Sequence, residues 1–399
     1  MLRQFGAIFK APFWGRGFRP FFLLGAAYAM LTVAAWIFFA SGAAEAPVSW
    51  NNPALWHAHE MIYGFTVAII AGFLLTAVAN WTGGAPIRQV RLALLCLVWA
   101  AGRMGFWYSY APPVILSVID LSFIPLLAGS LAVPLIRSWN KRNFVFLGML
   151  ALLFLGNLHM HLAAAEVVGG DPRITAYVAV MIVMLVIALV GGRIIPSFTV
   201  ASLRMRGQVR HQTDQRKTDL AALLLLLALS IALIISGLDS SVTGVFAIGA
   251  ALAHLWRMRF WHSFEAASDP LVGILHAGYL WLVAGLFALG LHGLQLLDQA
   301  SLALHMLTVG CIGSMTIGMM ARVALGHTGR PVAARPLTVF AFWMMQGAAL
   351  ARCFAILVGE ANYLVWIGVS GLLWVAAFAA YLAVYTPVLL QARPDGSPP

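Results

Sequence analysis

The chain has 399 residues, of which 62% are hydrophobic and 9% are charged. A soluble domain carries roughly 25% charged residues, so this composition excludes an ordinary soluble protein. The formal net charge is +11, but the basic residues are spread over many short loops, which suits contact with anionic lipid headgroups and predicts no nucleic-acid partner. The three cysteines form no CxxC pair, which argues against an iron–sulfur or thiolate metal site.

Apolar stretches of membrane-spanning length recur along the whole chain. A helix needs roughly 20 predominantly apolar residues to cross a bilayer. Twelve stretches approach that length, at 18–40, 55–80, 89–110, 113–136, 144–165, 174–196, 219–237, 241–257, 270–293, 300–323, 336–358 and 363–390. The seventh and eighth are short and close together. The sequence therefore predicts an all-α integral membrane protein with about twelve transmembrane helices.

The charges in the connecting loops predict a topology. Basic residues gather in the N-terminal arm, in alternate loops and in the C-terminal tail. The intervening loops hold six acidic residues and one basic residue, Arg173. Because cytoplasmic loops of membrane proteins are enriched in Lys and Arg, both termini are expected in the cytoplasm.

The same map predicts the domain organisation. We expect a single polytopic membrane domain over residues 1–399. Its longest loop, 197–218, is basic and expected to be cytoplasmic, and it separates the first six spans (1–196) from the last six (219–393). The end of the chain, 394–399, is expected to be a disordered tail.

The predicted depths place seven ionisable or metal-binding side chains near the outer face of the membrane. They are His57, His59, Glu60, His159, His161, His292 and His305. Burying such groups in hydrocarbon costs several kcal/mol unless they are paired or bind a metal. We therefore predict metal or haem ligation in this layer.

Helix geometry separates the histidines within each pair. Successive residues of an α-helix turn by about 100°, so His57 and His59 point about 200° apart and cannot both chelate one ion. The same holds for His159 and His161. Glu60 is predicted on the face of His57, as a proton carrier or as the carboxylate that orients an imidazole. The candidate metal ligands are His57, His59, His159, His161, His276 and His305.

Two structural features are predicted beside this layer. Asn51, Asn52 and Pro53 form a natural N-terminal cap and first turn, which starts the helix just before the first histidine. Arg103 and Asp120 fall at equal depth in adjacent antiparallel spans, and we expect them to form an ion pair.

A second polar site is predicted toward the cytoplasmic side. His276 lies inside the ninth span and His327 follows the tenth, and Arg193, Arg322 and Arg330 are expected at a similar depth. Three other histidines fall in or beside basic loops and are expected to be solvated: His211, His254 and His262.

Four segments carry a resemblance to a known family. They are WHAHEM (56–61) with AGFLLTAV (71–78) and NWTG (80–83), GGRIIPSFT (191–199), LHAGYLW (275–281), and MMAR (319–322) with GHTGRP (326–331). Through them the chain resembles the NnrS family, bacterial membrane proteins of the nitric-oxide response. The resemblance implies about twelve spans, bound haem of b type, copper as well, and a multi-pass location in the bacterial inner (cytoplasmic) membrane.

These residues and the family resemblance together predict a haem- and copper-containing protein that binds or transforms nitric oxide in denitrification or nitrosative stress. Its electrons are expected to come from an unidentified donor. Glu60 is the expected catalytic proton carrier. The expected cofactor-binding residues are His57, His59, His276, His305, Arg322, His327 and Arg330. The alternative is a secondary transporter of a metal or metal complex. Transporters bind substrate near the bilayer midplane, whereas the histidine layer is predicted toward one face.

Overall fold

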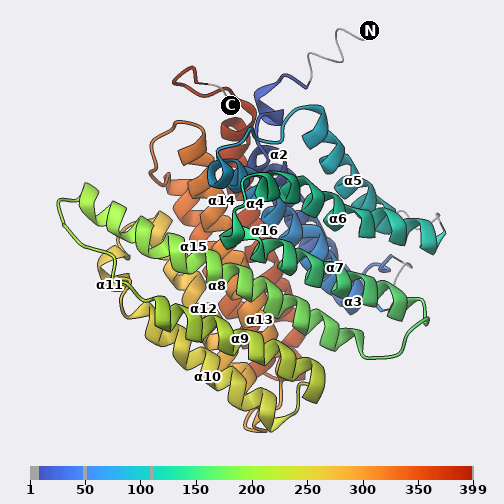
Figure 1. Cartoon of the computed structure of the whole chain (residues 1–399). Helices are drawn as coiled ribbons and strands as arrows, with labels where there is room; N and C mark the ends of the chain where they lie inside the picture. Colours follow the sequence, from blue (N-terminus) through green and yellow to red (C-terminus); the bar gives the residue numbers. More distant parts are fainter. Residues whose placement is uncertain (1–8, 48–51, 108–111, 398–399) are drawn as a thin grey trace. The chain divides into compact units, whose positions relative to one another are not determined.

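The computed structural model of the protein describes residues 9–47, 52–107 and 112–397 (Figure 1). Within these ranges every regular element is a helix. Eleven helical runs there are long and apolar enough to cross a membrane. They are α2 (Phe18–Ala40), α3–η2–α4 (Pro53–Thr82), α5 (Val90–Trp107), α6 (Pro113–Arg137), η3–α7 (Lys141–Ala164), α8 (Pro172–Met205), α9 (Arg216–Ser236), α12 (Pro270–Gly293), α13–η4–α14 (Ala300–His327), α15 (Pro336–Leu357) and α16 (Glu360–Leu390). The predicted all-α membrane architecture is confirmed.

The helix α10 (Ser241–Met258) occupies the place of the eighth predicted span but is not among these eleven. It carries His254 and Arg257, which reduce its hydropathy. Both side chains are buried, because α10 packs against α9 and α12. The expectation that His254 is solvated is therefore wrong: it projects into helix packing rather than into the loop that follows.

Two of the transmembrane runs contain a stretch of π-helix directly after a predicted ligand histidine. The first run is α3 (Pro53–His59), η2 (Glu60–Thr66) and α4 (Val67–Thr82), and the second is α13 (Ala300–His305), η4 (Met306–Ile312) and α14 (Gly313–His327). A π turn re-aims the side chains that follow it and occurs frequently at functional sites.

The start of α3 follows the predicted cap. The side chain of Asn52 accepts a hydrogen bond from the backbone N–H of Ala54 at 2.9 Å, and Pro53 occupies the first helical position. Asn51, the other predicted cap residue, lies outside the described residues. The cap fixes where the helix begins, and hence the register that places His59.

The connection between α8 and α9 is shorter than predicted. Helix α8 continues to Met205 and α9 begins at Arg216, so the connecting segment is 206–215 instead of 197–218.

At the C-terminus α16 ends at Leu390, and Asp395 accepts hydrogen bonds from the Arg393 guanidinium and from the backbone N–H of Ser397.

The chain forms two compact units. Unit 1 comprises Met1–Ala176, Met320–Ala333 and Phe378–Pro399. In it α2 packs on α4, α4 on α6, and α6 on α5 and α7. A Cβ at Gly72 of α4 would lie 2.9 Å from the Cβ of Phe21 in α2, so the small residue permits the close approach of these helices.

Unit 2 comprises Tyr177–Met319 and Ala334–Ala377. Helix α10 packs against both α9 and α12, and η4 packs against both α12 and α15. A Cβ at Gly293 of α12 would lie 2.6 Å from the backbone nitrogen of Gly244 in α10. Small residues again determine where two helices of the unit cross.

Candidate metal centre

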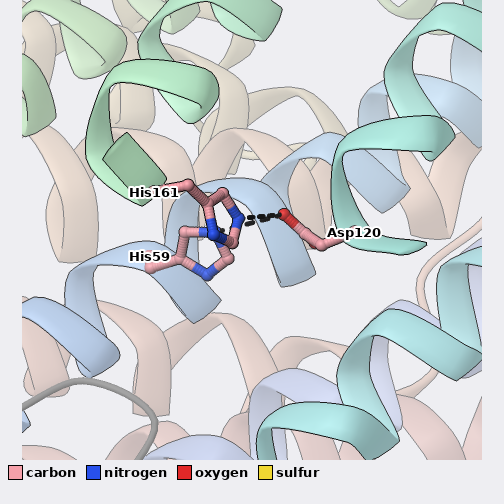
Figure 2. Close-up of side chains that lie close together, drawn as sticks. All are labelled: His59, Asp120 and His161. Atoms are coloured by element: carbon pink, nitrogen blue, oxygen red, sulfur yellow. Dashed lines mark hydrogen bonds and ion pairs between the residues drawn. The ribbon is translucent and has the colours of Figure 1, made fainter. Parts of the chain in front are cut away.

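Within the described residues, three buried side chains of unit 1 form a group able to hold a metal ion (Figure 2). His59 ends α3, Asp120 lies in α6 and His161 lies in α7. Each offers one ligand atom, and these atoms all lie within 4.8 Å of one another. The sequence predicted both histidines as ligands but identified Asp120 only as the ion-pair partner of Arg103.

The group converges on one carboxylate oxygen, Oδ2 of Asp120. Nε2 of His161 lies 2.9 Å from it and Nε2 of His59 lies 3.4 Å from it. The Asn157 amide nitrogen also donates to this oxygen, at 2.7 Å. Two imidazoles from different helices therefore aim the same ring nitrogen at the same point.

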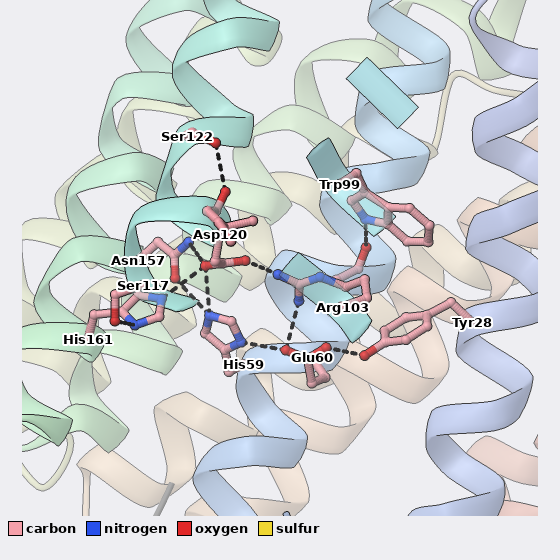
Figure 3. Close-up of polar contacts among 12 residues, drawn as sticks. Tyr28, His59, Glu60, Trp99, Arg103, Ser117, Asp120, Ser122, Asn157 and His161 are labelled. Carbon is pink, nitrogen blue, oxygen red and sulfur yellow. Dashed lines mark hydrogen bonds and ion pairs between the residues drawn. The ribbon is translucent and has the colours of Figure 1, made fainter. Parts of the chain in front are cut away.

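The other ring nitrogen of each histidine is held by a neighbouring polar group (Figure 3). Nδ1 of His59 lies 2.7 Å from Oε1 of Glu60, and Nδ1 of His161 lies 2.9 Å from the hydroxyl of Ser117. Metal-binding histidines in proteins are commonly oriented through the second nitrogen in this way. The arrangement thus directs both Nε2 atoms toward Asp120.

An arginine joins the two carboxylates of the site. Nη1 of Arg103 donates to Oε1 of Glu60 at 2.7 Å, and Nη2 pairs with Oδ1 of Asp120. The predicted Arg103–Asp120 ion pair is confirmed. A Cβ at Gly64 would lie 3.0 Å from Nη1 of Arg103, so this glycine makes room for the guanidinium. The hydroxyl of Tyr28 donates to the remaining oxygen of Glu60.

The charges of this cluster do not cancel while both histidines are neutral. Glu60 and Asp120 carry two negative charges and Arg103 carries one positive charge. Their side chains are 0%, 3% and 5% exposed, so solvent does not screen the excess. A buried net charge is costly, and the site therefore favours one further positive charge.

The contacts of His59 identify it as the position of this further positive charge. The Asn157 nitrogen donates to Asp120, so its amide oxygen faces Nε2 of His59, at 2.8 Å, while Oε1 of Glu60 faces Nδ1. The amide orientation follows from this network. A neutral imidazole has one N–H and one lone pair, so one of the two contacts would set a lone pair against an oxygen. The ring requires either a second proton or a metal ion at Nε2.

The two histidines of α3 serve different neighbours, as predicted. The His57 ring stacks on the Trp36 ring with centroids 4.4 Å apart, whereas His59 contacts Asn157 and Glu60. The prediction that Glu60 shares the face of His57 is wrong. The chain enters the π-helix η2 at Glu60, and its carboxylate contacts His59 instead.

The histidines of α7 also diverge. Nδ1 of His159 lies 2.8 Å from the hydroxyl of Thr175 at the start of α8, away from the group formed by His161. His159 therefore contributes no ligand atom to the His59–Asp120–His161 group.

In unit 2 the hydrogen bonds of two histidines define their tautomers. The Thr199 hydroxyl donates to the carbonyl of Ile195 at 2.8 Å, so it accepts from Nε2 of His276, at 2.9 Å. Nδ1 of His276 then carries the lone pair, buried and without a hydrogen-bond partner among the described residues. Nδ1 of His305 lies 2.7 Å from the carbonyl of Ser301, which places its proton there and the lone pair on Nε2.

The predicted inner site divides between the units. His327, Arg322 and Arg330 belong to unit 1, whereas His276 belongs to unit 2. The His327 ring lies 5.7 Å from the Phe18 ring, and Arg330 donates to the Gln391 amide oxygen at 3.2 Å. Within unit 1 these residues connect the end of α14 to α2 and to the end of the chain.

A largely buried set of polar side chains in unit 2 was not predicted from the sequence. Nε of Arg257 donates to Asp219 at 2.6 Å and its Nη1 donates to the Tyr279 hydroxyl at 2.8 Å. Nδ1 of His254 lies 2.7 Å from that hydroxyl. The Arg257 guanidinium occupies the space that a Cβ at Gly192 would need. The pair Gly191–Gly192 inside a span was the one sequence signal of this close approach.

Comparison with known proteins agrees with the resemblance seen in the sequence. Residues 12–393 match the model of a family described as NnrS protein. No curated protein matches the chain. The family match covers every transmembrane helix described above.

Proposed function

The chain belongs to the NnrS family, and we propose that it is a haem- and copper-containing membrane protein that binds or transforms nitric oxide. Membership supports a membrane protein of the nitric-oxide response. The proposal adds the cofactors, the residues that hold them and a setting in denitrification or nitrosative stress. The observation that carries it is the buried His59–Asp120–His161 group.

The donor atoms of this group suit a first-row transition metal such as copper. Imidazole nitrogen and carboxylate oxygen are ligands that copper(II), iron(II) and zinc accept. For bonds of about 2.0–2.2 Å, adjacent ligand atoms lie about 2.9 Å apart in octahedral geometry and about 3.3 Å apart in tetrahedral geometry. The Nε2–Oδ2 distances of 2.9 Å for His161 and 3.4 Å for His59 fall at these spacings.

The same group does not fit haem. The His59 and His161 rings lie 5.3 Å apart, and Phe106 packs against both, with ring centroids at 5.1 and 5.8 Å. A porphyrin cannot enter between rings packed at van der Waals contact. We therefore place a single metal ion here and look for haem ligands elsewhere.

Charge and protonation support a cation at this point. His59 and His161 would hold a metal ion through their Nε2 atoms in place of the protons there, and their Nδ1–H groups would then donate to Glu60 and Ser117. The excess negative charge of Glu60, Asp120 and Arg103 is offset at the same time. Metal binding at such a site releases protons and strengthens as pH rises.

The residues around the group can deliver protons. Tyr28 donates to one oxygen of Glu60, and the other oxygen contacts Nδ1 of His59. These contacts support the proposal that Glu60 is the proton carrier of the site. A metal held by His59, Asp120 and His161 would provide a binding position for nitric oxide, a small uncharged molecule that would reach the buried site through apolar packing.

A histidine that ligates haem binds the iron through the lone pair of one ring nitrogen, while the other ring nitrogen is held by a hydrogen bond. Nε2 of His305 meets this condition, because Nδ1 is held by the carbonyl of Ser301. Nδ1 of His276 also carries a lone pair and is buried without a partner among the described residues. These two residues of unit 2 are the proposed haem ligands.

Optical spectra and metal analysis of protein purified from cells supplied with haem, iron and copper test the proposal. We expect haem absorption bands that shift with nitric oxide, and about one further metal ion per chain. His161→Gln should lose that ion, whereas the matched variant His159→Gln, two residues away on α7, should retain it. Wild-type protein with neither haem nor the additional ion would overturn the proposal.

A further inference from the structure

The sequence around His59 is repeated around His305. Each histidine is followed by glycine after five and after thirteen positions and by Thr-Gly at positions twenty-three and twenty-four. The pairs are Gly64 and Gly310, Gly72 and Gly318, Thr82 and Thr328, and Gly83 and Gly329. The match spans one complete transmembrane run in each half of the chain.

The backbone repeats with the sequence. Both histidines end an α-helix and are followed by seven residues of π-helix. Gly83 and Gly329 are both left-handed, with φ of 65° and 68°. The threonine before each bonds back to the carbonyl four residues earlier, at 2.8 and 2.6 Å. The two runs therefore share their bends and their ends as well as their residues.

The helix that precedes each run also has a counterpart in the other half of the chain. A Cβ at Gly64 would meet Tyr28, and one at Gly72 would meet Phe21, both from α2. A Cβ at Gly310 would meet Trp281, and one at Gly318 would meet Ile274, both from α12. In each helix the two contacting residues are seven positions apart. The contacts identify α12 as the counterpart of α2. We infer an internal duplication.

The helix after each run carries a buried arginine at about the depth of that run's histidine. Arg103 of α5 and Arg352 of α15 are 4% and 9% exposed. His305 lies five positions after the start of α13, and Arg352 lies five before the end of α15. Helix α15 packs against α13 and η4. Arg352 is thus the counterpart of Arg103 in unit 2.

The two arginines differ in their counter-ions. Arg103 is neutralised by Glu60, which follows the histidine, and by Asp120, seventeen positions after the arginine. The position that follows His305 is Met306, and no carboxylate pairs with Arg352 among the side chains that the structure describes. Nη2 of Arg352 contacts the Tyr363 hydroxyl at 3.4 Å. Its Nη1 is buried without a hydrogen-bond partner among the described residues.

A buried guanidinium in a membrane protein requires an anion. We propose that unit 2 holds a second ligand site, the duplicate of the metal centre, in which Arg352 binds an oxyanion group that the ligand supplies in place of the chain's carboxylates. The guanidinium fork matches carboxylate and phosphate oxygens. The oxyanion is a carboxylate of haem held on His305, an identity that rests on the proposed function, or the phosphate of a bound phospholipid.

Ligand content of purified protein tests this site, with haem measured by absorbance and tightly bound phospholipid by phosphorus analysis and mass spectrometry. Arg352→Gln removes the guanidinium. Met306→Glu supplies the counter-ion that the first copy has at this position, so the protein keeps a neutralised arginine and remains folded while the ligand is excluded. Arg335→Gln, an exposed arginine at the start of the same helix, is the matched control.

We expect Arg352→Gln and Met306→Glu each to lower one ligand at least tenfold, and Arg335→Gln to leave it unchanged. Loss of haem identifies a carboxylate, and loss of phospholipid with unchanged haem identifies a phosphate. Wild-type protein without either ligand, or ligand retained in folded Met306→Glu protein, overturns the proposal. The additional metal ion of unit 1 is counted in the same samples, so failure of the metal centre and failure of this site are read separately.

Discussion

Removal of Arg103 gives the sharpest test of how the metal centre is held together. Arg103→Met leaves Glu60 and Asp120 buried with their positive partner gone, whereas the wild-type guanidinium contacts both carboxylates. Charges about 4 Å apart at an effective dielectric constant of about 20 interact by about 4 kcal/mol. Deletion of one partner of a buried ion pair costs about 3–5 kcal/mol. We expect the free energy of unfolding to fall by about 3–5 kcal/mol.

The assay is unfolding in mixed detergent micelles titrated with sodium dodecyl sulfate, followed by tryptophan fluorescence. Arg91→Met, an exposed arginine of the same helix, is the control and should change stability by less than about 0.5 kcal/mol. Adding Glu60→Gln and Asp120→Asn to Arg103→Met removes the orphaned charges and should recover most of the loss. A loss below about 1 kcal/mol, or no recovery in the triple variant, would refute the reasoning.

Three further predictions follow from other contacts. Ser117→Ala removes the hydroxyl that orients His161, and metal affinity measured by chelator competition should fall about 10–100-fold; an unchanged affinity would contradict this role. Gly192→Ala places a methyl group where the Arg257 guanidinium lies, and it should destabilise the protein by about 1–3 kcal/mol in the same detergent titration. The control is Gly148→Ala, which has open space around it and should stabilise the protein by about 0.5–1 kcal/mol. The hydrogen bond from Arg173 holds the pKa of Asp171 below its ordinary value. The cap that Asp171 forms on α8 is therefore fully present above about pH 4 and is lost as the pH falls through the lowered pKa. Hydrogen exchange of the first turn of α8 should show this loss, and Asp171→Asn should abolish the pH dependence.

Much of the architecture was predictable because membrane burial imposes strong local rules. Apolar length predicted the spans, and the Asn52–Pro53 cap predicted the start of α3. Equal depth in antiparallel helices predicted the Arg103–Asp120 pair. Each of these rests on position along one helix or between two neighbouring helices.

The wrong expectations share a different origin. His254 was expected in solvent because it lies near a basic loop, but helix packing buries it against Tyr279. Glu60 was assigned to the face of His57 from helix periodicity alone, but its side-chain contacts with Arg103 and Tyr28 hold the carboxylate beside His59. Such lateral contacts between helices leave no periodic signal in the sequence.

The sequence by itself determined that this is a polytopic helical membrane protein with histidines in its spans, because the cost of exposing apolar residues to water and of burying charge in lipid is decided residue by residue. Only the tertiary structure decided which of those residues meet. Asp120 became a candidate ligand, and His159 separated from the site of His161, because α6 packs on α4 and α7 in unit 1, and α3, α6 and α7 there aim three side chains from distant parts of the chain at one point. The order of residues along the chain does not predict this convergence, because the convergence depends on which helix faces are buried together.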